Sequence, residues 1–197
     1  MDMDFWLQVL KVATALYIIT DAPGNLPFFI GLTDGSSAKE RSQTIITAII
    51  TGLILLAFFV FFGTLVLDLF NVTFSDLKIG GGILLIVISV EVLMNGKISS
   101  EKREDVGVVP LGCPLLVGPG AITTTLVLSH LYSFPALVTG VLICFFLIWL
   151  TLHFSEPIHR VVGHNGSMII TKIAAILVAA IAVHFARVGI QEIFFLQ

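Results

Sequence analysis

Long apolar runs alternate with short polar segments along the whole chain, and this pattern predicts helices that span a membrane. A helix that crosses a hydrocarbon core of about 30 Å needs roughly 20 predominantly apolar residues. Runs of about this length follow one another here, and turn residues and charges separate them. The pattern predicts six spans, at residues 5–32, 44–67, 79–94, 110–131, 135–154 and 168–194.

A charged segment near the middle divides the chain into two halves. The segment from Asn95 to Asp105 is the longest polar stretch, and we interpret it as a solvated linker. The predicted organisation is a first three-helix repeat at residues 1–95, a cytoplasmic linker at 96–109 and a second three-helix repeat at 110–197. In the first half, Ser37 and Glu40 have the spacing of a capping box, which predicts the start of the second span.

The distribution of Lys and Arg predicts how the chain is oriented in the membrane. Cytoplasmic loops carry an excess of these residues. One set of span ends carries Lys39, Arg41, Lys97, Lys102, Arg103, Arg160 and Lys172, and the other set carries only Lys11, Lys78 and Arg187. We therefore expect a multi-pass protein of the cytoplasmic membrane with both termini outside.

Two short segments of the first half recur in the second half. Because three spans are an odd number, the second copy must enter the membrane from the opposite side, which is an inverted repeat. The predicted fold class is therefore all-α: a polytopic integral membrane protein of six transmembrane helices, arranged as two inverted three-helix repeats with broken first and fourth helices. Chance similarity among apolar helices is the alternative. The matched segments are Ala22-Pro-Gly24 with Gly118-Pro-Gly120, and Gly81-Gly-Ile-Leu-Leu85 with Ala174-Ala-Ile-Leu-Val178, which places Glu91 opposite His184.

Composition supports the membrane assignment and excludes one class of partner. The chain of 197 residues is 57% hydrophobic and only 12% charged, whereas soluble domains carry roughly 25% charged residues. With a net charge of −3, it has no basic surface of the kind that nucleic acids require. Cys113 and Cys144 lie in apolar runs and are interpreted as packing residues.

Pro-Gly pairs inside the first and fourth spans predict that both helices are broken. Proline removes a backbone donor and glycine adds backbone freedom, and Pro27 follows the first pair, so we expect no continuous helix from Asp21 to Pro27. Non-helical backbone at membrane depth is tolerated where it packs in protein or lines a cavity. Matched breaks near the midplane are typical of secondary transporters. Two packed proline kinks are the alternative interpretation.

The predicted site lies at the two breaks. Half-helix N-termini near Asn25 and Ala121 would direct free N–H groups at an anionic group such as a carboxylate. Beside them stand the polar residues Thr20, Asp21, Asn25, Thr123, Thr124 and Thr125, and the glycines Gly24, Gly118 and Gly120 allow close approach of a ligand. Few of these residues are charged, so the site suits a small zwitterion.

Two carboxylates, Asp21 and Glu91, are the candidates for coupling to a cation. For Asp21 a ligand or proton role and a structural cap are both open. Glu91 is interpreted as a solvated residue at the end of its span, or as a proton relay if it is buried. His184 is interpreted as a hydrogen-bonded core histidine. We favour a proton as the coupling ion over sodium, although carbonyl and Thr oxygens would also suit sodium.

No motif indicates a cofactor, a metal site or an enzyme. His153, Glu156 and His159 form an H-x-x-E-x-x-H string, but the outer pair lies about 120° apart around a helix, and Pro157 interrupts it. The sequence contains no Gly-rich nucleotide loop, no G-x-S-x-G elbow and no H-E-x-x-H helix. We therefore expect a protein without catalytic activity.

The same residues resemble a known family. Three segments look like the MarC family, also called the neutral amino acid transporter family: Asp21-Ala-Pro-Gly-Asn-Leu-Pro27, the Gly80-Gly-Gly-Ile-Leu run, and Pro110-Leu-Gly-Cys-Pro-Leu-Leu-Val-Gly-Pro-Gly-Ala-Ile-Thr123. This chain departs from the family's D-P-x-G-N-x-P pattern by having Ala22 after Asp21. The resemblance covers essentially the full chain and implies a six-span inner-membrane protein of a family whose archaeal-type members carry glycine and other small neutral amino acids. It assigns Asp21, Pro23, Gly24, Asn25, Pro27, Gly118, Pro119, Gly120 and Thr123 to the substrate region.

The leading prediction is a secondary active transporter of small neutral amino acids that works by alternating access and is coupled to a cation. Its partners would be a zwitterionic amino acid, a proton or sodium ion and the lipid bilayer. A passive channel or facilitator and a non-transporting membrane subunit are the alternatives. The sequence leaves open whether the chain forms a homo-oligomer.

Overall fold

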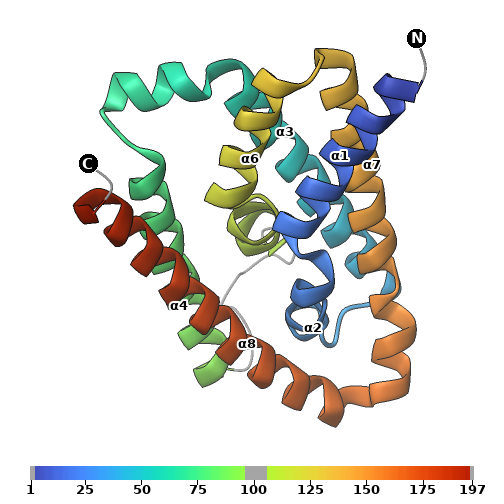
Figure 1. Ribbon diagram of the computed structural model, residues 1–197. Helices are drawn as coiled ribbons and strands as arrows, with labels where there is room; N and C mark the ends of the chain where they lie inside the picture. The colour runs from blue at the N-terminus through green and yellow to red at the C-terminus, as the bar shows by residue number, and fades with distance from the viewer. Residues whose placement is uncertain (1–2, 96–105, 196–197) are drawn as a thin grey trace.

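A computed structural model describes residues 3–95 and 106–195, and the regular elements within them are helices (Figure 1). The predicted linker, residues 96–109, lies for the most part outside these ranges. The elements are α1 (Met3–Thr20), α2 (Ala22–Leu32), α3 (Ala38–Phe70), α4 (Phe74–Asn95), η1 (Gly107–Leu116), α6 (Pro119–Leu131), α7 (Phe134–His153) and α8 (Ser155–Phe195).

The helices have the length and surface of membrane spans. Five of them are long and apolar enough to cross a membrane, and the number is six if η1 and α6, bent by 58°, are counted as one span. Large apolar side chains such as Ile54, Phe61 and Leu65 are more than 60% exposed, which suits a surface in contact with lipid. These features confirm the prediction of an all-α polytopic membrane protein.

Local signals in the sequence set several of the helix boundaries. The predicted capping box is present: Ser37 Oγ accepts from the Glu40 N–H at 3.3 Å, and Glu40 Oε2 accepts from the Ser37 N–H at 2.7 Å. At the other end of α3, Asn71 has a left-handed conformation with φ 50° and closes the helix.

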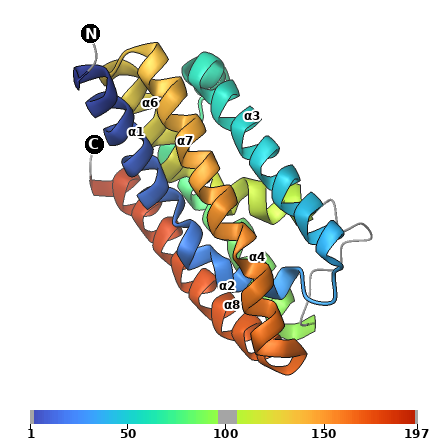
Figure 2. The same ribbon diagram turned by 90° about the vertical axis from the view of Figure 1, so that its right-hand side faces the viewer.

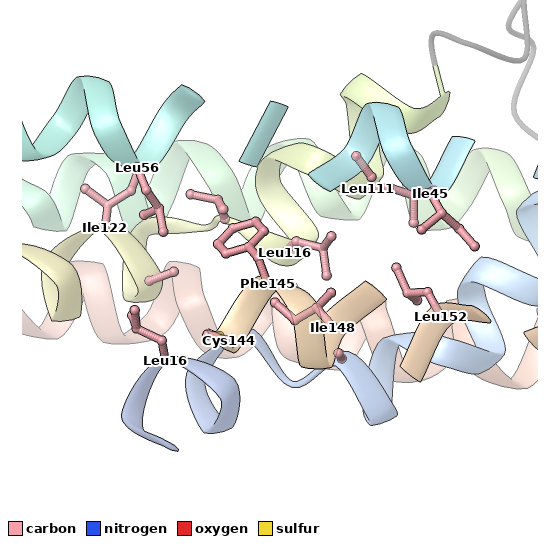
Figure 3. Close-up of a cluster of buried hydrophobic side chains, with 14 of the residues drawn as sticks. Leu16, Ile45, Leu56, Leu111, Leu116, Ile122, Cys144, Phe145, Ile148 and Leu152 are labelled. Atoms are coloured by element: carbon pink, nitrogen blue, oxygen red, sulfur yellow. The ribbon is translucent and has the colours of Figure 1, made fainter. Parts of the chain in front are cut away.

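The buried side chains form two clusters. The larger cluster joins α1, α3, η1, α6 and α7 and contains Leu16, Leu56, Leu116 and Phe145 (Figure 3). The smaller cluster joins α4 and α8 and also contains Phe28 of α2. The helices therefore pack as two units, and α2 contributes to both.

Small residues let α4 and α8 pack closely in antiparallel directions (Figure 1). A Cβ atom at Gly82 would lie 2.6 Å from the Ala182 carbonyl oxygen, and one at Gly189 would lie 2.6 Å from the Ser75 carbonyl oxygen. The backbones touch at these glycines because no side chain intervenes. This close approach keeps α4 and α8 together as a pair.

Figure 2 shows the fourth predicted span as two differently directed segments. η1 lies across the neighbouring helices beside α3, and α6 follows it after a 58° bend. Pro110 and Pro114 lie inside η1, and Val109 and Cys113 before them have extended backbone conformations. This is the conformation that a following proline favours, so the sequence of η1 rules out a straight helix.

Candidate functional site

The break in the first span is a single residue. Asp21 has a left-handed conformation with φ 43° and ψ 50°, and its Oδ1 accepts from the Gly24 N–H at 3.2 Å as the cap of α2. The helix is interrupted within Asp21 to Pro27, as predicted, and the interruption is confined to Asp21 because α2 starts at Ala22. Pro23 lies in the first turn, where a missing N–H costs nothing, and Pro27 is accommodated within the helix.

Asn25 connects the two broken spans. Its side chain is only 7% exposed, and its Nδ2 donates to the Thr20 carbonyl at 3.0 Å and to the Leu115 carbonyl at 3.5 Å. The first carbonyl ends α1 and the second lies in the last turn of η1. One amide group thus satisfies carbonyls at both breaks, which helix ends leave without partners.

The break in the fourth span opens α6. Gly118 is the N-cap and provides no side chain, and Pro119 occupies the first helical position. A Cβ atom at Gly118 would lie 2.7 Å from the Pro114 carbonyl oxygen, so only glycine fits there. The second half-helices begin at Ala22 and Pro119, slightly before the predicted starts near Asn25 and Ala121, so each Pro-Gly pair stands in a first helical turn and not in the break itself.

Two adjoining cavities lie between these breaks and the α4–α8 pair. The smaller has a volume of about 280 Å³ and is lined by Ile19, Lys78, Gly120, Thr123, Thr124, His184, Phe185 and Val188. The larger has a volume of about 400 Å³ and is lined by Asp21, Gly24, Leu177, Ala180, Ile181 and His184. His184 belongs to the wall of both cavities.

The structure divides the predicted site residues into two groups. Asp21, Gly24, Gly120, Thr123 and Thr124 line the cavities. The others serve the breaks or the packing and do not contribute to the walls of these two cavities: Pro23, Asn25, Pro27, Gly118, Pro119 and Ala121. Thr123 directs its Oγ1 to the Pro119 carbonyl at 2.8 Å, which leaves its oxygen lone pairs free to accept.

His184 differs from its sequence-based interpretation, whereas both interpretations of Glu91 stay predictions. Glu91 is half-buried on α4 and does not contribute to the walls of these two cavities. The interpretation of His184 as a core histidine is wrong, because it is exposed toward the cavities and its Nδ1 lies 3.2 Å from Arg187 Nη2. The helical pattern could not reveal this, because the orientation of His184 depends on how α8 packs.

Sequence reasoning missed Lys78 as a site residue. We expected it at the outer membrane interface, but it lines the smaller cavity and forms an ion pair with Glu192 of α8. Glu192 Oε2 also accepts from Ser75 Oγ at 2.8 Å. A lysine early in an apolar helix, with a glutamate late in another, is a signal that could have suggested the pair.

No group of three His, Cys, Asp or Glu residues able to hold a metal ion is present among the residues that the structure describes. His153 stacks on Trp149 with ring centroids 5.2 Å apart. The side chains of Glu156 and His159, the other members of the H-x-x-E-x-x-H string, lie outside the described part.

The chain is similar to known membrane proteins over nearly its full length. Residues 6–194 match the model of the family described as MarC family integral membrane protein. A UPF0056 membrane protein of Archaeoglobus fulgidus is 38% identical over 192 residues, which cover 91% of this chain and 90% of that protein. The UPF0056 membrane protein YhcE of Escherichia coli is 31% identical over 202 residues, which cover 93% and 92%. No solved structure matches the chain.

The helices, their apolar outer surface and the broken spans define a multi-pass integral membrane protein. With a family match over nearly its full length, the chain belongs to the MarC family. The predicted resemblance is thereby confirmed. The names of the relatives state no substrate.

Proposed function

We propose that this protein is a secondary active transporter that carries small neutral amino acids, such as glycine, by alternating access. One observation carries the proposal. The two cavities that share His184 are bounded on one side by the first turns of both second half-helices and on the other side by α4 and α8. A site between half-helix ends and a separately packed helix unit is typical of secondary transporters.

The cavity walls favour a small ligand with both hydrogen-bonding and charged groups. Ligand pockets have volumes of roughly 300–1,000 Å³. The volume of about 280 Å³ lies just below this range, and the volume of about 400 Å³ lies near its lower end. Thr123, Thr124, Asp21, Lys78 and His184 supply polar groups among apolar residues. A short zwitterion matches this combination better than a long or strongly charged molecule.

The two clusters of buried side chains suggest the moving parts. Alternating access requires one unit to rock against another around a fixed site. The α4–α8 pair has its own cluster, and the larger cluster joins the remaining helices. The antiparallel packing of α4 on α8 agrees with the predicted inverted repeat, which stays a prediction. The location in the cytoplasmic membrane and the outside location of both termini also stay predictions.

The direct test is uptake of labelled glycine into proteoliposomes with a pH gradient, a sodium gradient or neither. Thr123→Val removes a cavity hydroxyl and should raise KM about 3- to 10-fold, since a neutral hydrogen bond is worth about 0.5–1.5 kcal/mol. Thr139→Val is the matched control. Its Oγ1 donates to the Pro135 carbonyl at the same 2.8 Å as Thr123 does to Pro119, but on α7, outside both cavities.

The outcomes separate the candidate functions. Gradient-driven accumulation that depends on Thr123 and not on Thr139 supports coupled transport. Saturable uptake that never exceeds equilibrium indicates a facilitator instead. If no small neutral amino acid enters the liposomes, the proposal fails.

We further propose that a proton is the coupling ion and that Asp21 carries it. Asp21 lines the larger cavity and caps α2. Asp21→Asn keeps a cap oxygen but has no carboxylate to bind a proton, so it should retain glycine exchange and lose accumulation driven by a pH gradient. Glu91→Gln should retain accumulation, because Glu91 does not contribute to either cavity wall. Normal accumulation by Asp21→Asn would remove Asp21 from the coupling role.

A further inference from the structure

We propose that Lys78 binds the carboxylate of the transported substrate, and that its ion pair with Glu192 makes the site select zwitterions over anions. This inference rests on the proposed function and names the charged contact within it. It starts from the position of Lys78, which lines the smaller cavity together with Gly120, Thr123 and Thr124 of α6.

The ion pair with Glu192 fixes the side chain of Lys78, which is a residue of the cavity wall. Glu192 pairs with Lys78 Nζ and also accepts from Ser75 Oγ at 2.8 Å, so two residues one turn apart on α4 hold one carboxylate of α8. The close approach of Gly189 to Ser75 and Ile79 keeps the two helices together just before this point. Lys78 is therefore fixed by its own helix pair and does not depend on α6.

The Lys78 ammonium retains donors for a ligand. An ammonium group has three N–H donors, and the hydrogen bond described for Lys78 uses one of them, to Glu192. The remaining donors can form a charge-assisted hydrogen bond with a carboxylate in the cavity. The hydroxyl oxygens of Thr123 and Thr124, which line the same cavity, can accept from an ammonium group of the same ligand.

The charge of Glu192 explains why the ligand should be neutral overall. An unpaired lysine in a partly dehydrated cavity would attract any small anion. The adjacent glutamate balances its charge, so a ligand that brings a cation along with its carboxylate meets less uncompensated charge than an anion. The amino and carboxyl groups of one short amino acid meet this condition.

The test measures equilibrium binding of labelled glycine to the purified full-length protein in detergent, with unlabelled glycine, glycinamide and acetate as competitors. In glycinamide a neutral amide replaces the carboxylate. Three variants are compared with the unmodified protein. Glu192→Gln breaks the ion pair but keeps Lys78, the double variant Lys78→Met with Glu192→Gln removes both charges, and Lys11→Met removes an exposed lysine of α1 that does not line either cavity.

We expect the unmodified protein and Lys11→Met to bind glycine more tightly than glycinamide and acetate. The double variant should lose about 10- to 100-fold in glycine affinity, the worth of a hydrogen bond to a charged group, and should no longer distinguish glycine from glycinamide. Glu192→Gln should keep that distinction and gain affinity for acetate. Loss of a purely structural ion pair would not raise the affinity for acetate, so this gain distinguishes the two roles.

Two results would overturn the assignment of Lys78: a double variant that still prefers glycine to glycinamide, or a Glu192→Gln variant that loses as much glycine affinity as the double variant. If the protein accumulates glycine in liposomes while either result holds, the proposed transport stands and the role of Lys78 falls. If glycine binds through Lys78 but is never transported, the transport proposal falls and the binding site stands. Absence of glycine binding to the unmodified protein contradicts both.

Discussion

Phe28 and Phe29 are neighbours in α2 and both side chains are fully buried, yet they belong to different hydrophobic clusters. Phe28 belongs to the smaller cluster, with residues of α4 and α8, and Phe29 belongs to the larger cluster, with residues of α1, α3, η1, α6 and α7. Successive residues of a helix point about 100° apart, so a helix that lies between two units contacts both. If α4 and α8 rock against the other helices, the contacts of α2 with one of the two units must change. α2 follows the break at Asp21 directly in the chain.

This arrangement predicts separate effects for the two phenylalanines. Phe29→Ala should open the larger cluster, which contains the native Cys144, and should speed the reaction of this thiol with a small apolar reagent. Phe28→Ala should leave Cys144 protected, because its cavity forms in the other cluster. Each substitution should cost about 3–5 kcal/mol of stability.

The measurement requires Cys144 as the only thiol, so it uses a Cys113→Ala background, in which Cys113, the other free cysteine of the chain, is removed. A second background, without Cys113 or Cys144, carries Val92→Cys. Val92 of α4 is fully buried in the smaller cluster, so this thiol is the reciprocal reporter for Phe28→Ala. Equal exposure of both reporters in both variants would mean that the helices form a single unit.

Gly82 and Gly80 of α4 give a matched test of how α4 packs on α8. Gly82→Ala places a Cβ atom 2.6 Å from the Ala182 carbonyl and 3.0 Å from the Ala186 nitrogen, and backbone atoms cannot turn aside. We expect it to destabilise the protein by about 1–3 kcal/mol. Gly80→Ala meets no atom within 4 Å and should be neutral, or stabilising by up to about 1 kcal/mol through higher helix propensity.

Unfolding of the two variants in mixed detergent micelles gives the comparison. A Cβ atom at Gly81, between these two positions, would lie 3.3 Å from Pro119 of α6 and so does not test the contact with α8. If Gly80→Ala destabilises the protein as much as Gly82→Ala, the register of α4 on α8 is different from the one described here.

The cap at the first break predicts a difference between two substitutions of Asp21. Asp21→Ala removes the oxygen that accepts from the Gly24 N–H and should cost about 0.5–2 kcal/mol. Asp21→Asn should lower the stability by only about a few tenths of a kcal/mol, because Asn caps helices equally well and tolerates the left-handed conformation. Thermal unfolding in detergent measures both, and equal losses would show that the charge of Asp21, and not its cap, stabilises the break.

The amide of Asn25 predicts how strongly the two breaks support each other. Asn25→Ala leaves the Thr20 and Leu115 carbonyls without their donor and should cost about 1–2 kcal/mol. Asn25→Asp has the same size but brings a carboxylate to the two carbonyls, so it should cost more than Ala. Unfolding of both variants tests this order, and an Asp variant as stable as the parent would contradict the described hydrogen bonds.

Much of the fold could be predicted because its signals are local. The lengths of apolar runs set the spans, Ser37 and Glu40 set a helix start, and Pro-Gly pairs marked both half-helix starts to within three residues. The extent of the first break could not be predicted, because proline is compatible with a first turn as well as with a break. The bend between η1 and α6 also has local causes in Pro110 and Pro114, although its angle of 58° depends on packing against α3.

The sequence by itself determined that the chain lies in a membrane, roughly where its apolar spans lie, and which two spans are broken, because hydrophobicity, proline and caps act over a few residues. The tertiary structure decided which residues of the breaks face a cavity. Thr123 and Thr124 face it, while Asn25 is buried between the two breaks and joins carbonyls that are 95 residues apart in the chain, Thr20 and Leu115. Lys78 and His184 enter the site only because α4 and α8 pack against each other and present these side chains to α6, and no local pattern specifies contacts between helices so far apart in sequence.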